Sequence, residues 1–178
     1  TEAAVVLLGR AARYLPADSA HVRRVVERLL SALRTPSELV QEAVASCLPA
    51  LVRASAAAKD VPSIVDRLFV DLLHGDKYAT RRGAAYGLAG VVKGRGVSAI
   101  RELRILARLS EAAHDTSTTT TRQGALFAYE LLASTLHVLL EPYVDGILAD
   151  LLLCFGDTHA DVREATQDAA RVLMRSLS

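Results

Sequence analysis

The chain has 178 residues, of which 51% are hydrophobic and only 4% aromatic, and 21 basic residues nearly balance 20 acidic ones. This hydrophobic fraction excludes a disordered chain, and the scarcity of aromatic residues favours packed helices over β-sheets. A net charge of +1 provides no general attraction to nucleic acid. No apolar run reaches the roughly 20 residues that a membrane span requires, so we expect no membrane partner.

Apolar residues recur at helical spacing along most of the chain, with proline, glycine and polar residues between the periodic segments. The pattern predicts antiparallel helix pairs with short connections. In chain order, the expected helices cover residues 1–14, 20–34, 37–54, 62–74, 77–93, 98–114, 119–139, 142–155 and 160–177.

The sequence repeats itself with a nearly constant period. Gln41, Arg81, Arg122 and Arg163 follow one another at almost equal intervals, and the residue two positions later is always small. Helix pairs with a period of roughly 40 residues are typical of HEAT repeats. We therefore predict an all-α fold, an α-solenoid of about four and a half antiparallel helix pairs. The expected units are 1–16 (partial), 17–56, 57–96, 97–139 and 140–178, as one segment of a longer solenoid.

The stretch RRGAAYGLAGVVKGRG (81–96) contains five glycines, three of them within the expected helix 77–93, where each costs about 1 kcal/mol relative to alanine. A phosphate-binding loop would follow a strand and show the spacing G-x-x-x-x-G-K-[ST], which is absent. We interpret the glycines instead as places where two helices approach closely. The small residues assigned to this packing are Ala43, Gly83, Gly87, Gly90, Gly124 and Ala165.

Arginines near the start of three successive second helices follow aspartates in the preceding loops. The arginines are Arg81, Arg122 and Arg163, and the aspartates are Asp76, Asp115 and Asp157. In a stack of repeats, each arginine would reach an aspartate of an adjacent loop and fix the register of the stack. We predict in particular a contact between Arg122 and the carboxylate of Asp76 or Asp115.

A local basic cluster stands out from the neutral background. Three of its arginines, at spacings of 3 and 4, would share one face of the expected helix 98–114. Acidic residues lie nearby, so an ordinary solvated helix face is one interpretation. The other is a strip that contacts the phosphate backbone of RNA or an acidic protein surface. The cluster comprises Lys93, Arg95, Arg101, Arg104 and Arg108.

No residue pattern indicates catalysis or a cofactor. The histidines show neither i, i+4 pairing nor a cysteine partner at ligand spacing, and the nucleophile motif G-x-S-x-G is absent. Cys47 and Cys154 are expected to be buried, reduced thiols. Glu130 is either a surface residue or an acid that bonds an arginine or tyrosine across the repeat interface. We predict a non-catalytic protein without cofactor, metal or small-molecule ligand.

The motifs RRGAAYGLAGVVKGRG, RQGALFAYELLA and LEPYVDGILADLLLCFGDTHADVREATQDAARVLM resemble the middle region of the HEAT-repeat translational activators of general amino-acid control. The HEAT domain of fungal translation elongation factor three is similar. The resemblance is strong over residues 77–178 and weaker before them. It implies a cytoplasmic scaffold that binds stalled or colliding ribosomes and helps to activate the kinase of initiation factor 2 alpha.

The same resemblance implies ribosome contact and an ATP-binding-cassette partner protein for this middle region, with the kinase bound by other parts of the parent chain. Two other classes remain open on the residues alone. One is a generic HEAT scaffold of the transport-receptor or phosphatase-subunit kind. The other is a helical-repeat DNA glycosylase, against which stand the missing tryptophan and the near-neutral charge.

Overall fold

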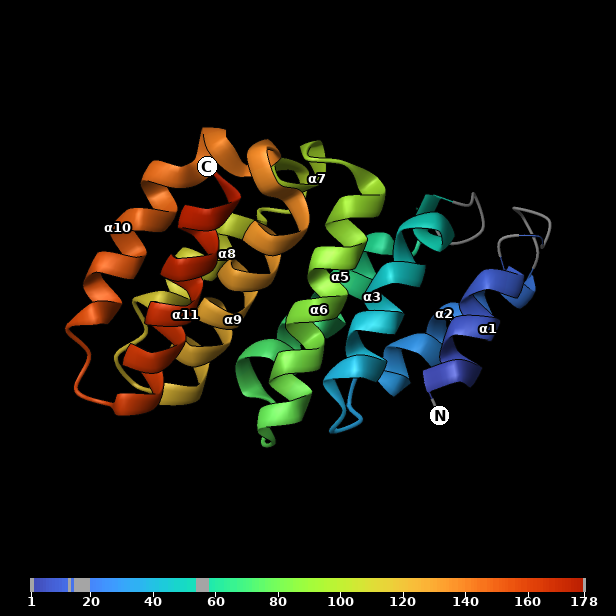
Figure 1. Cartoon of the computed structure of the whole chain (residues 1–178), viewed down its shortest axis with the longest axis horizontal. Coiled ribbons are helices and arrows are strands. Elements are labelled where there is room, and N and C mark those ends of the chain that lie inside the picture. Colours follow the sequence, from blue (N-terminus) through green and yellow to red (C-terminus); the bar gives the residue numbers. More distant parts are fainter. Residues whose placement is uncertain (1, 13, 15–19, 54–57, 178) are drawn as a thin grey trace.

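The computed structural model describes residues 2–12, 14, 20–53 and 58–177, and every regular element among them is a helix. The helices form a stack that runs from the N-terminal end to the C-terminal end of the chain (Figure 1). Among the described helices, none is both long and apolar enough to cross a membrane. The all-α solenoid predicted from the sequence is confirmed.

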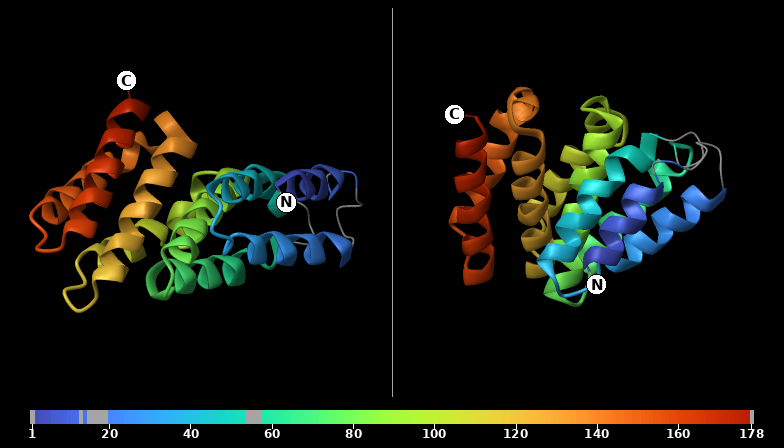
Figure 2. Two further views of the ribbon diagram at one scale, coloured as in Figure 1. Left: turned by 60° about the horizontal axis from the view of Figure 1, so that its bottom comes forward. Right: turned by 45° about the vertical axis from the view of Figure 1, so that its right-hand side comes forward.

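The stack has two layers, seen most clearly in the N-terminal half of the left view of Figure 2. We call the layer of first helices the A layer and the layer of second helices the B layer. The A layer contains α2 (Ala20–Ala32), α5 (Val61–His74), α7 (Ser98–Glu102), α8 (Ile105–Ala113) and α10 (Val144–Phe155). The B layer contains α1 (Glu2–Ala12), α3 (Glu38–Arg53), α6 (Tyr78–Arg95), α9 (Thr119–Leu136) and α11 (Ala160–Ser176).

Consecutive B helices pack directly on one another, and the A helices α2, α5, α8 and α10 pack chiefly on B helices. The core lies between the layers and is built from aliphatic side chains of both, such as Leu33, Leu72, Leu88 and Leu126. Because α6 and α9 have helices on several sides, they are buried along most of their length. Their burial explains why both helices are apolar nearly all round instead of on one stripe.

The expected helix 98–114 is wrong as a single element, since it is divided into α7 and α8. Arg104 lies at the break in the left-handed backbone region, with φ 51°. Ile100 and Ile105 are both buried. At about 100° per residue, an uninterrupted helix would point these two side chains about 140° apart, so the break lets both enter the core.

The expected boundary between 119–139 and 142–155 also differs. Helix α9 ends at Leu136, and a 3-10 helix, η1 (His137–Tyr143), precedes α10. His137 changes the chain direction with φ 49°. Pro142 lies within η1 and cannot donate a backbone hydrogen bond, so the α-helical pattern resumes only at Val144.

Candidate functional site

Nearly equally spaced residues near the start of the B helices define the sequence repeat, and we call them the repeat column: Gln41, Arg81, Arg122 and Arg163. Each residue of the repeat column anchors the loop of its own helix pair. In each of the last four repeats, the side chain near the start of the B helix donates to a main-chain carbonyl oxygen of the preceding loop. The donor–acceptor distances are 3.0 Å from Gln41 to Thr35, 2.8 Å from Arg81 to Gly75, 2.7 Å from Arg122 to Asp115 and 2.7 Å from Arg163 to Asp157.

The same column also reaches forward to the next repeat. Gln41 donates to the carbonyl oxygen of Ala79 at 2.9 Å, and Arg81 donates to the side-chain oxygen of Gln123 at 2.7 Å. In the next repeat, Nε of Arg122 lies 2.6 Å from a carboxylate oxygen of Asp157. In three successive repeats, a single side chain therefore ties a loop, its own helix and the following repeat together.

The predicted partner of Arg122 is wrong: the carboxylate that it contacts is that of Asp157, in the following repeat. Asp115 gives Arg122 only its main-chain oxygen, and its carboxylate accepts hydrogen bonds from the amide and hydroxyl of Ser117. Asp76 likewise offers only a main-chain oxygen, 3.4 Å from Arg81. The interaction predicted as a simple arginine–aspartate ladder is thus a loop anchor with a forward contact.

The contact between Arg122 and Asp157 is shielded from water, since the two side chains are 11% and 10% exposed. Burial alone would raise the pKa of Asp157, but hydrogen bonds from Arg122 and from the backbone of His159 outweigh it and lower that pKa to about 2. For Arg81, desolvation lowers the pKa of the guanidinium, whose buried Nε has no hydrogen-bond partner in the described structure. Buried pairs of this kind fix register more than they add stability.

The glycines of the B helices lie where backbones approach closely. A Cβ atom on Gly83 would lie 1.8 Å from the carbonyl oxygen of Leu33, and one on Gly124 would lie 2.1 Å from that of Leu72. Both oxygens belong to the last turn, or just beyond it, of the A helix in the preceding repeat. Only glycine permits this approach, which accounts for its presence in spite of its low helix propensity.

Other small residues of the set lie along the same seam. A Cβ on Gly90 would meet the carbonyl oxygen of Ala45 in α3 at 2.8 Å, whereas one on Gly87 would meet only the ends of leucine side chains. Ala43 and Ala165 are buried at the matching positions of α3 and α11. The Gly90 contact brings α6 close to the backbone of α3.

The basic cluster does not form one helical face, because the break at Arg104 separates Arg101 from Arg108. Arg108 is committed to the fold: it pairs with Asp66 at 2.9 Å and lies over the ring of Phe69, 3.7 Å from its centroid. The remaining residues are exposed, at the end of α6 and in the turn and short helix that follow. We call these four residues, Lys93, Arg95, Arg101 and Arg104, the basic turn.

Ion pairs between successive A helices were missed by the sequence reasoning. Arginines and acids about one repeat apart join α2 to α5 and α5 to α8. Their spacing of 37 to 42 residues was a usable signal, since it matches the repeat period. The pairs are Arg34–Asp71 at 2.9 Å, Arg67–Glu27 at 2.7 Å and Arg108–Asp66 at 2.9 Å.

Glu130 bonds an arginine across the repeat interface, which is one of the two alternatives that the sequence left open. Arg82 of α6 donates to it at 2.8 Å, and the two side chains are 14% and 16% exposed. The guanidinium also lies 5.3 Å from the ring centroid of Phe127 and 5.7 Å from that of Tyr86. Burial alone would lower the pKa of Arg82, but the hydrogen bond to Glu130 outweighs it and raises that pKa, so the arginine stays charged.

Cys47 and Cys154 are free and buried. Burial, together with the nearby charge of Asp157, raises the pKa of Cys154 to about 11. Among the described residues, no group of three or more His, Cys, Asp or Glu side chains is placed to hold a metal ion.

Stacked helix pairs, a glycine seam and side chains that connect each repeat to the next define an α-solenoid built from HEAT-type repeats. Residues 81–178 match the family described as the EF3 N-terminal HEAT repeat. The chain belongs to this family.

Curated relatives match almost the whole chain. It is 47% identical over 177 residues to the stalled ribosome sensor GCN1 of Mus musculus, covering 99% of this chain and 7% of that protein. It is 44% identical over 177 residues to Protein ILITYHIA of Arabidopsis thaliana, and the match covers 99% of this chain and 6% of that protein. The eIF-2-alpha kinase activator GCN1 of Saccharomyces cerevisiae is 37% identical over 174 residues, and the match covers 97% of this chain and 6% of that protein.

The chain therefore spans less than a tenth of the length of these relatives. The resemblance to translational activators that the motifs indicated is confirmed. It extends through residues 1–76, where the sequence motifs alone gave only a weak match.

Proposed function

We propose that this chain is a non-catalytic scaffold segment of a ribosome-associated translational activator, which promotes activation of the initiation factor 2 alpha kinase during amino-acid starvation. The observation that carries the proposal is 47% identity, over 99% of the chain, to a protein named a stalled ribosome sensor. The yeast relative is named as an activator of the eIF-2-alpha kinase. A segment of this kind acts in the cytoplasm and needs no cofactor.

The contacts between repeats support a scaffold role. Forward hydrogen bonds from the repeat column, ion pairs of the A layer and the buried Arg82–Glu130 pair each join one repeat to the next. In a solenoid, stability is roughly the sum of repeat terms and nearest-neighbour interface terms. Strong interfaces therefore hold the repeats at fixed angles, as a scaffold that places partners at set distances requires.

The basic turn is the proposed ribosome contact of this segment. Lys93, Arg95, Arg101 and Arg104 are exposed, and Arg104 pairs with Glu111 at 3.4 Å on the surface. Surface pairs of this kind contribute about 0 to 1 kcal/mol and are easily exchanged for a phosphate. An ATP-binding-cassette protein is the proposed second partner of the segment, and the kinase binds other parts of the parent chain.

Co-sedimentation of the 178-residue chain with ribosomes at graded salt tests the ribosome contact. The test variant reverses the charge of the basic turn: K93E, R95E, R101E and R104E. A control variant carries the same change in net charge at exposed residues elsewhere: R24E, R28E, K59E and K77E. We expect the test variant to bind less and to show a flatter salt dependence, by about 0.7 to 0.9 in logarithmic slope for each phosphate that it no longer neutralises.

Equal loss of binding in both variants would show that only overall charge matters, and the basic turn would not be the contact. A wild-type chain that stays in the supernatant at low salt would contradict ribosome binding by this segment. That result would favour a generic protein-binding HEAT scaffold.

A further inference from the structure

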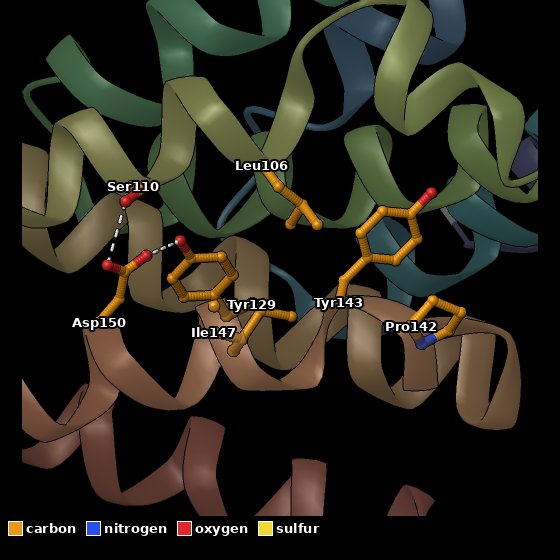
Figure 3. A pocket seen from close by; sticks show the side chains of 8 residues that line it. Leu106, Ser110, Tyr129, Pro142, Tyr143, Ile147 and Asp150 are labelled. Carbon is orange, nitrogen blue, oxygen red and sulfur yellow. Dashed lines mark hydrogen bonds between the residues drawn. The ribbon is translucent and has the colours of Figure 1, made fainter.

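A pocket of about 300 Å³ opens between the last two repeats, between α8 and α10 and above α9. In Figure 3 the carboxylate of Asp150 lies at one end of the pocket, where Ser110 and Tyr129 hold it, and the ring of Tyr143 lies toward the other end. Leu106 and Ile147 contribute apolar walls. The pocket therefore has an anionic end and an apolar, aromatic end.

Asp150 occupies a position that holds a core leucine in an earlier repeat. The buried residues of α5 are Val65, Leu68, Phe69 and Leu72 within its central turns, and those of α10 are Ile147, Asp150, Leu151 and Cys154. The two sets align residue for residue when the sequence is shifted by two repeat periods, which is also the spacing between Arg81 and Arg163. Leu68 thus corresponds to Asp150, which is only 4% exposed.

A buried carboxylate is costly unless it is paired, and among the described residues this one has only neutral donors at hydrogen-bond distance. Tyr129 donates to one oxygen at 2.5 Å, and Ser110 donates to the other at 3.0 Å. Burial, the hydrogen bond and the charge of Asp150 raise the pKa of Tyr129, so its phenol stays protonated and donates. His114 is 3.6 Å away, and its Nδ1 donates to the carbonyl oxygen of Ser110 at 2.8 Å.

The junction between α8 and α10 thus differs from those before it in the A layer. Arginine–carboxylate pairs join α2 to α5 and α5 to α8, but here Ser110 faces Asp150 across a similar separation of 40 residues. A hydroxyl cannot neutralise the charge as a guanidinium does.

We propose that this pocket binds an arginine side chain of a partner protein, with the guanidinium on Asp150 and the stem along Leu106, Tyr143 and Ile147. Each carboxylate oxygen already accepts one hydrogen bond and retains a lone pair. A guanidinium fills both with two parallel N–H bonds, which the ammonium of lysine cannot do. The volume lies at the lower limit for ligand pockets, so it suits one side chain better than a cofactor.

This inference is independent of the proposed ribosome association, and its test uses the purified chain alone. A short peptide with blocked ends and a single arginine is titrated against the protein, and backbone amide shifts of Ser110, Tyr129, Ile147 and Asp150 are followed by NMR. The same peptide with lysine or with neutral citrulline in place of arginine provides the comparison. We expect saturable shifts with arginine, binding several-fold weaker with lysine, and none with citrulline.

Two variants test the assigned residues. Asp150→Asn keeps the size of the side chain but removes its charge, and we expect it to weaken arginine-peptide binding about tenfold or more. Asp145→Asn, on the exposed face of the same helix, is the matched control and should bind as the wild type does. Should Asp150→Asn fail to fold, Tyr143→Ala, which leaves the carboxylate in place, should still weaken the binding by removing a wall.

The inference is overturned if arginine and citrulline peptides behave alike, if the wild-type chain shows no saturable shifts, or if Asp150→Asn binds as tightly as Asp145→Asn. Equal affinity for lysine and arginine would overturn the two-bond geometry on which the choice of arginine rests.

Discussion

Replacing Gly124 with alanine tests the close packing of the B helices. In an isolated helix this change is favourable by about 1 kcal/mol, because glycine loses more backbone entropy on folding. In the protein, the new Cβ would lie 2.1 Å from the carbonyl oxygen of Leu72 and 3.0 Å from its carbon. Since these atoms are backbone, α9 must move away from the end of α5.

The expected loss follows from two opposing effects. Adding a methyl group to a packed interior costs about 1 to 3 kcal/mol. Because the new contact would be so short and would be made with backbone atoms, we expect the cost of Gly124→Ala to lie at the upper end of this range. Subtracting the gain in helix propensity leaves a net destabilisation of about 2 kcal/mol. The movement would also strain the hydrogen bond from Thr121 to the carbonyl oxygen of Leu73, now 3.2 Å long.

Gly146→Ala is the matched control, because a Cβ at this helical position meets nothing within 4 Å. It should stabilise the protein by about 0.5 to 1 kcal/mol. Urea denaturation of both variants at equal m-values gives the comparison, and their free energies of unfolding should differ by about 3 kcal/mol in total. A Gly124→Ala variant as stable as the wild type would refute the packing explanation of the glycines.

Three further outcomes are expected. The pKa of Asp157 is about 2 in the folded chain and 3.8 ordinarily, so its contribution of about 2 kcal/mol to stability is present above pH 4 and is lost as the pH falls toward 2. Asp157→Asn should therefore flatten this part of a stability–pH profile. An unchanged slope would contradict the assigned role of Asp157. Glu130→Gln should lower the free energy of unfolding by about 3 kcal/mol, because it leaves the largely buried guanidinium of Arg82 without its charged partner. Glu38→Gln, at an exposed partner of the same arginine, should cost less than about 1 kcal/mol. Equal losses in the two variants would argue against the importance of the buried pair. The thiol of Cys154, with its pKa raised to about 11, should react with a thiol reagent at pH 8 only as fast as the protein opens, and rapid labelling of the native chain would contradict its burial.

Much of the fold could be predicted from the sequence because the repeat supplies the same information several times. The constant period and the small residue two positions after each column residue agree with one another. Most helices consequently begin and end within three residues of the expected positions. The break between α7 and α8 could not be predicted, since residues 98–114 keep an uninterrupted helical pattern and a non-glycine residue adopts φ 51° there.

The contacts of the candidate site were harder to predict than the helices. Sequence spacing places Arg122 near loops on both sides of its repeat, but it does not show toward which loop the guanidinium points. The structure directs it forward, because the carbonyl oxygen of Asp115 fixes one end of the side chain and leaves the other facing Asp157. Asp150 was missed for a related reason. Within a run of leucines in α10, an acid looks exposed until alignment with α5 shows that it occupies a core position.

The forward contacts of the repeat column also make the successive interfaces unequal. Gln41 reaches a neutral carbonyl, Arg81 a neutral amide and Arg122 a carboxylate, so the charge shared across the interface increases toward the C-terminal end. Hydrogen bonds that involve charged groups are roughly twice as strong as neutral ones. Because the stability of such a chain depends on nearest-neighbour interfaces, we expect a junction with a weaker polar contact to open before one with a stronger polar contact. We therefore expect amide hydrogen exchange to show earlier opening at the α3–α6 junction than at the α9–α11 junction, and the reverse order would show that apolar packing decides the sequence of opening.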